Sequence, residues 1–407
     1  MNPFPSPRQR PSAGFTLVEM MTALLVLSLL VLLIAQLFAS ATSVTKLSTV
    51  RLDADTQARL VFDRMATDFT WMLRRPDVDF HFVKQADNNS AGAAQNNYSD
   101  TFFFFSEVPG YFNSAESTAN ESNTSLIGYR INPNPNTKSL QLERMAWGLT
   151  WDPDATPGYP LVYLTFSNFS NGLGSVLTDY TPTPASTIVG QQQWAGIDNA
   201  QSYNTADNQP NPGSTFHVLG DSVFRLEFCF LLNDGTYSVV PAINYTLPSG
   251  VAANNKLNAT APPQTSQSGY VVGSRWYDAT NYHAYICTNG TANAETWKPL
   301  GMADVQGVVV TIAILDQSSQ KLLGGKTAPL QAMAQALVGP QWSPTTGTLL
   351  NSLSSQSVSQ NKLPVLPATN WLNTVNQANF ATTIGIPKAV ASQVRIYQRI
   401  FYLNNTL

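Results

Sequence analysis

One acidic side chain stands inside an apolar segment near the start of the chain. Glu19 lies five residues into this segment and is followed by an almost uninterrupted apolar run from Met20 to Ala39. A carboxylate is expensive in a membrane, so its presence there indicates a function. The junction between Gly14 and Phe15, just ahead of the run, is a candidate cleavage point. These residues predict that the chemistry of this protein is concentrated at its N-terminus.

The apolar run is long enough to cross a bilayer. It covers residues 15–39, whereas a spanning helix needs roughly 20 residues. A secretory signal peptide is cut after its apolar core, but here the cut precedes the core, so the helix stays in the mature protein. Arg8 and Arg10, in the leader at residues 1–14, predict a cytoplasmic N-terminal side. The alternative is an ordinary signal anchor that happens to contain Glu19.

The junction and the glutamate also carry a family resemblance. The motif resembles the N-terminus of the type IV pilin and type II secretion pseudopilin superfamily through Gly14, Phe15, Thr16, Leu17, Val18 and Glu19. The resemblance implies cleavage by a prepilin peptidase after Gly14 and N-methylation of Phe15. It also implies that Glu19 pairs with the Phe15 ammonium group of a neighbouring subunit, with Thr16 hydrogen-bonding in the same cluster. The implied partners are other pilins or pseudopilins, the peptidase, an inner-membrane assembly platform and the lipid bilayer.

The helix is expected to continue beyond the membrane to about Leu73. Apolar or small residues recur every three or four positions, which is a helical stripe. The stripe consists of Leu47, Val50, Ala54, Ala58, Val61, Met65, Phe69 and Met72. Charged residues fall elsewhere, namely Arg51, Asp53, Asp55, Arg59, Asp63, Arg64 and Asp68. Arg74 and Arg75 suit the C-terminal dipole, and Pro76 ends the helix. The second half should pack on a globular domain, with a two-stranded coiled coil as the alternative.

Composition limits the partners of the remaining chain. Charged residues make up only 12% of the sequence and the net charge is −3, so nothing indicates a nucleic-acid partner. We assign residues 40–407 to one pilin-like globular domain, with residues 40–73 as the second half of the helix.

The globular part reads as an antiparallel sheet with insertions. Strand-like runs separated by Pro, Gly and Asn clusters are Thr101–Val108, Leu126–Ile131, Ser139–Ala146, Leu161–Ser167, Ser222–Leu232, Thr236–Val240, Asp304–Asp316 and Val394–Leu403. The run Asp304–Asp316 is apolar on both faces and should be a central strand, with the N-terminal helix covering one face. Asp87–Tyr98 and residues 168–213 read as loops. The predicted fold class is therefore α+β, pilin-like, with a long N-terminal helix packed on an antiparallel sheet.

A narrower resemblance rests on three of these strands. A strand ending in Asp234-Gly235, then a Val-rich strand, then a terminal strand with arginine before an aromatic residue look like the J-type minor pseudopilin of type II secretion. The overall layout is similar to the Verru-Chthon cassette protein C family, a predicted group of exported pilin-like proteins. Residues 168–213 and 244–300 are not covered by either resemblance.

An aromatic-rich insert occupies residues 269–300. It resembles small modules of phage-tail and carbohydrate-binding proteins, which use exposed aromatics on a short hairpin. The candidate ligand-binding residues are Trp276, Tyr277, Tyr285 and Trp297. The alternative is that these aromatics form a core for the insert itself, since they provide much buried area.

The remaining candidate chemistry is sparse. Cys229 and Cys287 are the two cysteines, and they form either a disulfide in an exported domain or two separate buried thiols. Asp152 and Asp154 could contribute to a calcium loop, as in some pseudopilins, but two acids lack the oxygen ligands that such a site needs. The alternative is a turn shaped by Pro153. No motif for a metal, cofactor or nucleophilic site appears. We therefore expect no enzyme, no catalytic residue, no metal site and no cofactor.

These observations predict a minor pilin-like structural subunit. It would be inserted in the inner membrane by one helix, with a cytoplasmic N-terminus and a periplasmic C-terminal domain, and then assembled into a pseudopilus or pilus. A filament of closely spaced helices leaves little room for so large a domain on each subunit, which favours a minor position. The alternative function is a pilus-associated adhesin or carbohydrate-binding pilin that uses residues 269–300.

Overall fold

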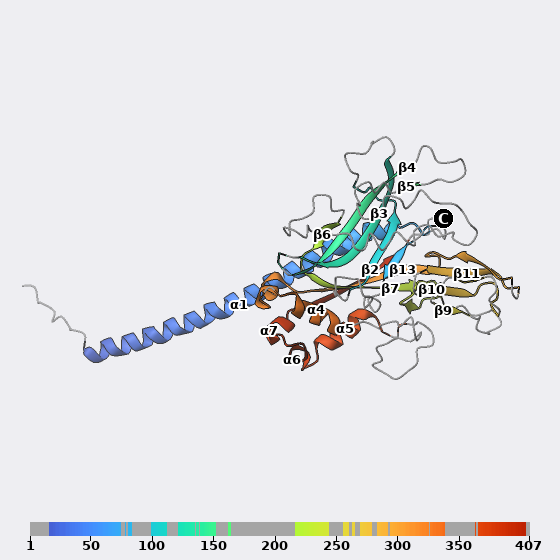
Figure 1. The fold of residues 1–407 in the computed structure, drawn as a ribbon. Coiled ribbons are helices and arrows are strands. Elements are labelled where there is room, and N and C mark those ends of the chain that lie inside the picture. The colour runs from blue at the N-terminus through green and yellow to red at the C-terminus, as the bar shows by residue number, and fades with distance from the viewer. Residues whose placement is uncertain are drawn as a thin grey trace, which may run out of the picture. The chain divides into compact units, whose positions relative to one another are not determined.

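The computed structural model of the protein describes residues 16–74, 78, 80–83, 99–111, 121–134, 136–137, 139–151, 162–163, 216–243, 255–259, 263–264, 269–278, 283–291, 294–324, 326–337, 363 and 365–403. The chain divides into two compact units, residues 1–53 and 54–407. Helices and largely antiparallel sheets are combined, so the predicted α+β class is confirmed (Figure 1). The predicted loops Asp87–Tyr98 and 168–213, and the acids Asp152 and Asp154, lie outside the described residues.

Helix α1 runs without a break over 54 residues, Leu17–Thr70. Its sequence contains neither proline nor glycine, the two residues that most disfavour a helix interior. It therefore belongs to both units: its first 37 residues, Leu17–Asp53, lie in the first and Ala54–Thr70 lie in the second.

The described residues of the second unit form three sheets, whereas the sequence predicted one. The first sheet has the order β1-β2-β3-β4-β5, and β6 also pairs with β4. Its strands are β1 His81–Val83, β2 Thr101–Ser106, β3 Glu121–Pro133, β4 Leu140–Trp151, β5 Val162–Tyr163 and β6 Phe216–Gly220. All of its pairings are antiparallel. The prediction of a single sheet is wrong because two further sets of strands pair only among themselves.

The second sheet has the order β14-β13-β7-β8 and is also antiparallel. Its strands are β7 Val223–Leu232, β8 Tyr237–Ser238, β13 Val305–Ile314 and β14 Arg395–Tyr402. The turn between β7 and β8 has Gly235 at φ 79°, a conformation that glycine adopts easily, and the Asp234 side chain accepts from the Thr236 N–H at 2.9 Å. The predicted hairpin and the central place of β13 are confirmed.

The third sheet belongs to the inserted module, defined as residues 255–300. Its order is β12-β11-β10-β9, and only the pairing of β9 with β10 is parallel. The strands are β9 Lys256–Ala259, β10 Arg275–Asp278, β11 His283–Asn289 and β12 Thr296–Pro299.

In the described residues between β13 and β14 there are five short helices, which the sequence pattern did not predict. They are α3 Gln317–Leu322, α4 Thr327–Ala336, α5 Pro367–Val375, α6 Phe380–Ile384 and α7 Lys388–Ala391. Their buried side chains join the main core and include Leu330, Met333 and Trp371. Val309 of β13 instead joins a separate buried cluster with Tyr277, Ala284 and Leu300 of the inserted module.

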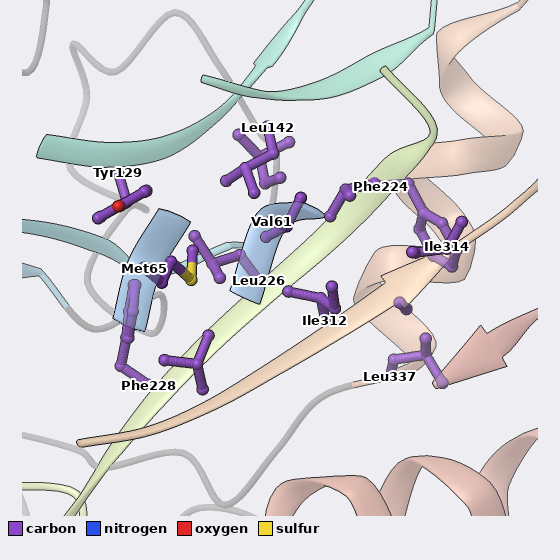
Figure 2. Close-up of a cluster of buried hydrophobic side chains, with 14 of the residues drawn as sticks. Val61, Met65, Tyr129, Leu142, Phe224, Leu226, Phe228, Ile312, Ile314 and Leu337 are labelled. Carbon is purple, nitrogen blue, oxygen red and sulfur yellow. The ribbon is translucent and has the colours of Figure 1, made fainter. Parts of the chain in front are cut away.

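The second half of α1 is enclosed between the first and second sheets. Figure 2 shows Val61 and Met65 between Tyr129 and Leu142 on one side and Leu226 and Phe228 on the other. The Phe69 ring lies 4.9 Å from Phe104 of β2 and 5.3 Å from Phe401 of β14, measured between ring centroids. The helical stripe predicted from the sequence is thus buried from Ala54 to Met72. The side chains of Leu47 and Val50 lie outside the described residues.

Candidate functional site

Helix α1 opens with a reciprocal cap between Thr16 and Glu19. The Thr16 backbone N–H and hydroxyl each donate to Glu19 Oε2 at 2.9 Å, and the Glu19 N–H donates to Thr16 Oγ1 at 3.3 Å. This is the capping-box arrangement of a Thr-x-x-Glu sequence. The cap holds the Glu19 carboxylate on the backbone N–H of Thr16, the residue that follows Phe15 in the sequence. The proposed cleavage residues Gly14 and Phe15 lie outside the described residues.

The side chains in the first part of α1 are exposed. Every side chain from Leu17 to Thr42 is exposed, and this stretch of 26 residues is long and apolar enough to cross a membrane. Exposed apolar surface on this scale is unusual for a soluble protein and marks a surface that lipid or protein covers. The helix therefore fits a membrane-anchored protein.

A buried carboxylate on α1, which the sequence analysis placed on the polar side, fixes the helix to the first sheet. Asp68 is fully buried and accepts two hydrogen bonds from Arg144 of β4, at 2.6 Å from Nε and 2.8 Å from Nη2. The hydroxyl of Tyr129 also donates to it. Burial, followed by the nearby Asp68 charge, raises the pKa of Tyr129 well above its ordinary value, so the hydroxyl remains a donor. Asp68 stands three residues after Met65, a spacing that already placed it beside the stripe.

Exposed contacts on α1 are directed at the terminal strand. The Tyr397 hydroxyl donates to Asp55 Oδ1 at 2.5 Å, and Arg399 Nη1 donates to Asp63 Oδ1 at 3.0 Å. Partial burial, then the contact with Asp55, raises the pKa of Tyr397. Tyr397 and Arg399 lie on the same face of β14 as Arg395. The alternation of these residues with Ile396, Gln398 and Ile400 in the sequence predicts this face.

Arg74 does not act as the expected dipole partner of its own helix. Its guanidinium donates to backbone carbonyls of other elements: to Met302 at 3.4 Å, to Leu403 at 3.5 Å, and also to Val305. The long side chain thereby connects the end of α1 to the beginning of β13 and the end of β14. Arg75 lies outside the described residues.

The aromatic residues of the inserted module pack against each other. The rings of Tyr270, Trp276 and Trp297 meet edge to face with centroids 5.2–5.7 Å apart, and Tyr285 is buried in the same cluster. Tyr277 belongs to a different cluster that includes Val309 of β13. The described geometry thus agrees with the packing alternative, in which the rings serve as a core, because their faces are covered by neighbouring rings or by the second sheet.

The module is also held to the second sheet by an ion pair. Arg275 of β10 donates twice to Asp304, from Nε to Oδ2 and from Nη2 to Oδ1, both at 2.9 Å. Asp304 Oδ2 additionally accepts from the Ile243 N–H at 2.9 Å. Such two-point pairing fixes orientation as well as distance.

A buried carboxylate in the module has no hydrogen-bond partner among the described residues. Glu295, just before β12, is fully buried, and neither of its carboxylate oxygens accepts a hydrogen bond in the described parts of the chain. The indole N–H of Trp297 is likewise buried and unbonded there. The sequence analysis named no carboxylate in this insert. Because an unpaired buried carboxylate costs several kcal/mol, Glu295 is the polar feature of the module that most needs compensation.

The two cysteines do not form the disulfide that was one of the sequence expectations. Cys229 on β7 and Cys287 on β11 are both buried thiols outside any disulfide. Burial raises the pKa of Cys287, which keeps it in the unreactive thiol form. The alternative of two separate buried thiols therefore describes this structure.

Among the described histidines, His81 has a strongly shifted pKa. His81 on β1 stacks on Phe103 with ring centroids 6.0 Å apart. Burial, and after it the charge of His283 from the module, lowers the pKa of His81 to about 3. Among the described residues, no three side chains of His, Cys, Asp or Glu are grouped in a way that would hold a metal ion.

Comparison with known families identifies the N-terminal segment. Residues 9–35 match the sequence model of the prokaryotic N-terminal methylation motif. The match contains Gly14, Phe15, Thr16 and Glu19, and it indicates a type IV pilin-like protein that is processed as a prepilin. No curated protein and no solved structure matches the chain.

Proposed function

We propose that this protein is a minor pilin-like subunit that is cleaved after Gly14, methylated on Phe15 and assembled with other pilins into a pseudopilus or type IV pilus-like machine. The observation that carries the proposal is the methylation motif at residues 9–35, followed directly by an uncovered apolar helix. Cleavage at this motif would leave a new ammonium group at the start of an apolar helix. Such a helix suits a subunit that is held in a membrane and then extracted into a filament.

The proposal includes location and topology. The chain crosses the inner membrane once, with its N-terminus in the cytoplasm and residues 54–407 in the periplasm. Arg8 and Arg10 before the span support this orientation, although Lys46 and Arg51 follow it. The role is structural, not enzymatic.

The minor position is supported by the size of the second unit. A filament brings its N-terminal helices close together, and a domain of about 350 residues on every subunit would crowd its surface. A subunit at the tip or at the initiation site avoids this crowding. The resemblance to J-type pseudopilins and Verru-Chthon cassette protein C agrees with such a position. The adhesin alternative gains no support from Trp276, Tyr277 and Tyr285, whose rings are buried.

Substitutions at Glu19 test the assembly role. Glu19 has two tasks in this proposal: it caps its own helix and it neutralises the Phe15 ammonium group of a neighbour. Glu19→Gln keeps a side-chain oxygen for the Thr16 bonds but removes the charge, whereas Glu19→Ala removes both. We expect both variants to insert into the membrane, because loss of a charge makes the span more apolar.

The readout is co-purification of the full chain with partner pilins after mild cross-linking in the native membrane. The proposal expects Glu19→Gln and Glu19→Ala to lose association to a similar extent, while Thr16→Val, which removes the hydroxyl alone, retains most of it. If Glu19→Gln associates as well as the parent chain, the charge has no role in assembly and the assignment is wrong.

A further inference from the structure

Among the described residues, the terminal strand β14 has no strand partner on the edge that faces away from β13. It pairs with β13 through eight consecutive residues without a bulge, and β13 continues the sheet on its other side. Arg395–Tyr402 is therefore a regular edge strand, and most of its side chains are partly or fully exposed, unlike those of β13. An edge of this kind is a template for another extended chain.

The hydrogen bonds between β13 and β14 identify which backbone groups of β14 face outward. The Leu403 N–H donates to the Gln306 carbonyl at 2.9 Å, so Leu403 is one of the residues that bond to the neighbouring strand. In an antiparallel pair, alternate residues bond to the neighbour and those between them point away. The backbone groups of Ile396, Gln398, Ile400 and Tyr402 thus face away from β13. Within the described chain they make no hydrogen bond along that edge.

Three common protections of an edge strand, namely proline, lysine and a bulge, are missing from β14. Natural edges carry proline, bulges or outward lysines that prevent pairing. β14 has no proline or lysine, and its register with β13 is continuous. Its cations, Arg395 and Arg399, belong to the face that meets α1, where Arg399 is paired with Asp63 and still about half exposed.

A second copy of the chain is a poor occupant. β14 runs in the same direction as the α1 segment above it, since Asp55 meets Tyr397 and Phe69 meets Phe401. Two copies joined antiparallel through β14 would carry these helix segments in opposite directions, which does not suit two chains anchored in one membrane. The opposite edge of the sheet, β8, has only two residues and is too short to pair with β14 of a neighbour.

We propose that the free edge of β14 binds an extended segment of a different protein, which adds a strand to the second sheet. Arg399, which is about half exposed, and Arg395, which is partly exposed, define its chemistry. The segment would carry acidic side chains on the face that meets these two arginines, and β-branched or apolar side chains beside Ile396 and Ile400. Opposite charges on directly facing strands stabilise such a pair. The exclusion of a second copy rests on the membrane anchoring in the proposed function.

Hydrogen exchange of the full chain in detergent micelles tests the site. The probe is a designed eight-residue peptide that alternates Thr or Val with Glu at the two positions facing the arginines. Without peptide, the amides of Ile396, Gln398, Ile400 and Tyr402 should exchange fast, whereas the alternate amides from Arg395 to Phe401 are protected by β13. With saturating peptide, the outward amides should slow roughly tenfold or more, because they become part of a ladder.

Two controls separate strand addition from charge attraction. The same peptide, N-methylated at the amides that face β14, keeps its charges and should not protect the edge. Tyr402→Pro removes one outward N–H without breaking the ladder to β13, since proline is tolerated where the N–H faces solvent. It should weaken peptide binding about five- to tenfold relative to Tyr402→Val, which keeps the N–H.

Several results would overturn the inference. These are slow exchange of the outward amides before peptide is added, equal protection by the N-methylated peptide, or equal affinity of Tyr402→Pro and Tyr402→Val. The first two use the parent chain, so they hold even if the proline variant fails to fold. The N-terminus of the same sample is determined separately: a protected edge on an unprocessed chain would retain this site and remove the pilin assembly.

Discussion

Two aspartates on α1, five residues apart, should differ sharply when each is replaced by alanine. Asp68 is fully buried and holds Arg144 and Tyr129, whereas Asp63 pairs with Arg399 and is 74% exposed. Asp68→Ala leaves a mostly buried guanidinium without its carboxylate, and breaking such a pair costs about 3–5 kcal/mol. Asp63→Ala removes an exposed pair that contributes about 0–1 kcal/mol.

The assay is urea unfolding of the full chain in detergent micelles, followed by the fluorescence of its tryptophans. Total stabilities of about 5–15 kcal/mol are usual, so the loss of Asp68 should remove a large part of the stability of the second unit. The double variant Asp68→Ala with Arg144→Met should recover part of the loss, because no unpaired buried charge remains. Equal effects of Asp63→Ala and Asp68→Ala, or no recovery in the double variant, would refute the assigned contact between α1 and the first sheet.

Two further predictions concern acid sensitivity and the thiols. His81 has a folded pKa of about 3 and an unfolded value of about 6.5, so only the unfolded chain binds the proton as the pH falls through this window. Acid should therefore destabilise the fold, by about 2 kcal/mol at pH 5 relative to pH 8. His81→Gln should remove that part of the pH dependence of stability. An unchanged pH dependence in the variant would contradict the role assigned to His81. For the thiols, a disulfide reagent should detect neither cysteine rapidly in the folded chain and two per chain after unfolding without reductant, whereas none after unfolding would reveal a disulfide.

Features set by local periodicity could be predicted from the sequence. The helix over α1, its buried stripe from Ala54 to Met72, the hairpin at Asp234-Gly235 and the central strand β13 depend on spacing and turn chemistry within short segments. The Thr16–Glu19 cap likewise follows from a four-residue pattern.

Features that depend on distant segments escaped prediction. The burial of Asp68 requires Arg144 from β4, and a charge count along one helix cannot reveal that partner. The division into three sheets depends on which strands pair across long connections. The described helices between β13 and β14 are too short to show a clear helical periodicity. The packing of the module aromatics depends on Tyr270, whose ring contacts both Trp276 and Trp297 and which was not among the predicted residues.

Processing of the N-terminus is the central claim about this protein, and intact-mass and N-terminal peptide analysis of the membrane-extracted protein measures it directly. The mature chain should begin with N-methylated Phe15, and a chain in which Gly14 is replaced by a bulky residue, such as Gly14→Leu, should keep its leader and remain unmethylated. A parent chain that begins at Met1, or one that begins beyond Ala39, would contradict the assignment as a prepilin-processed, pilin-like protein.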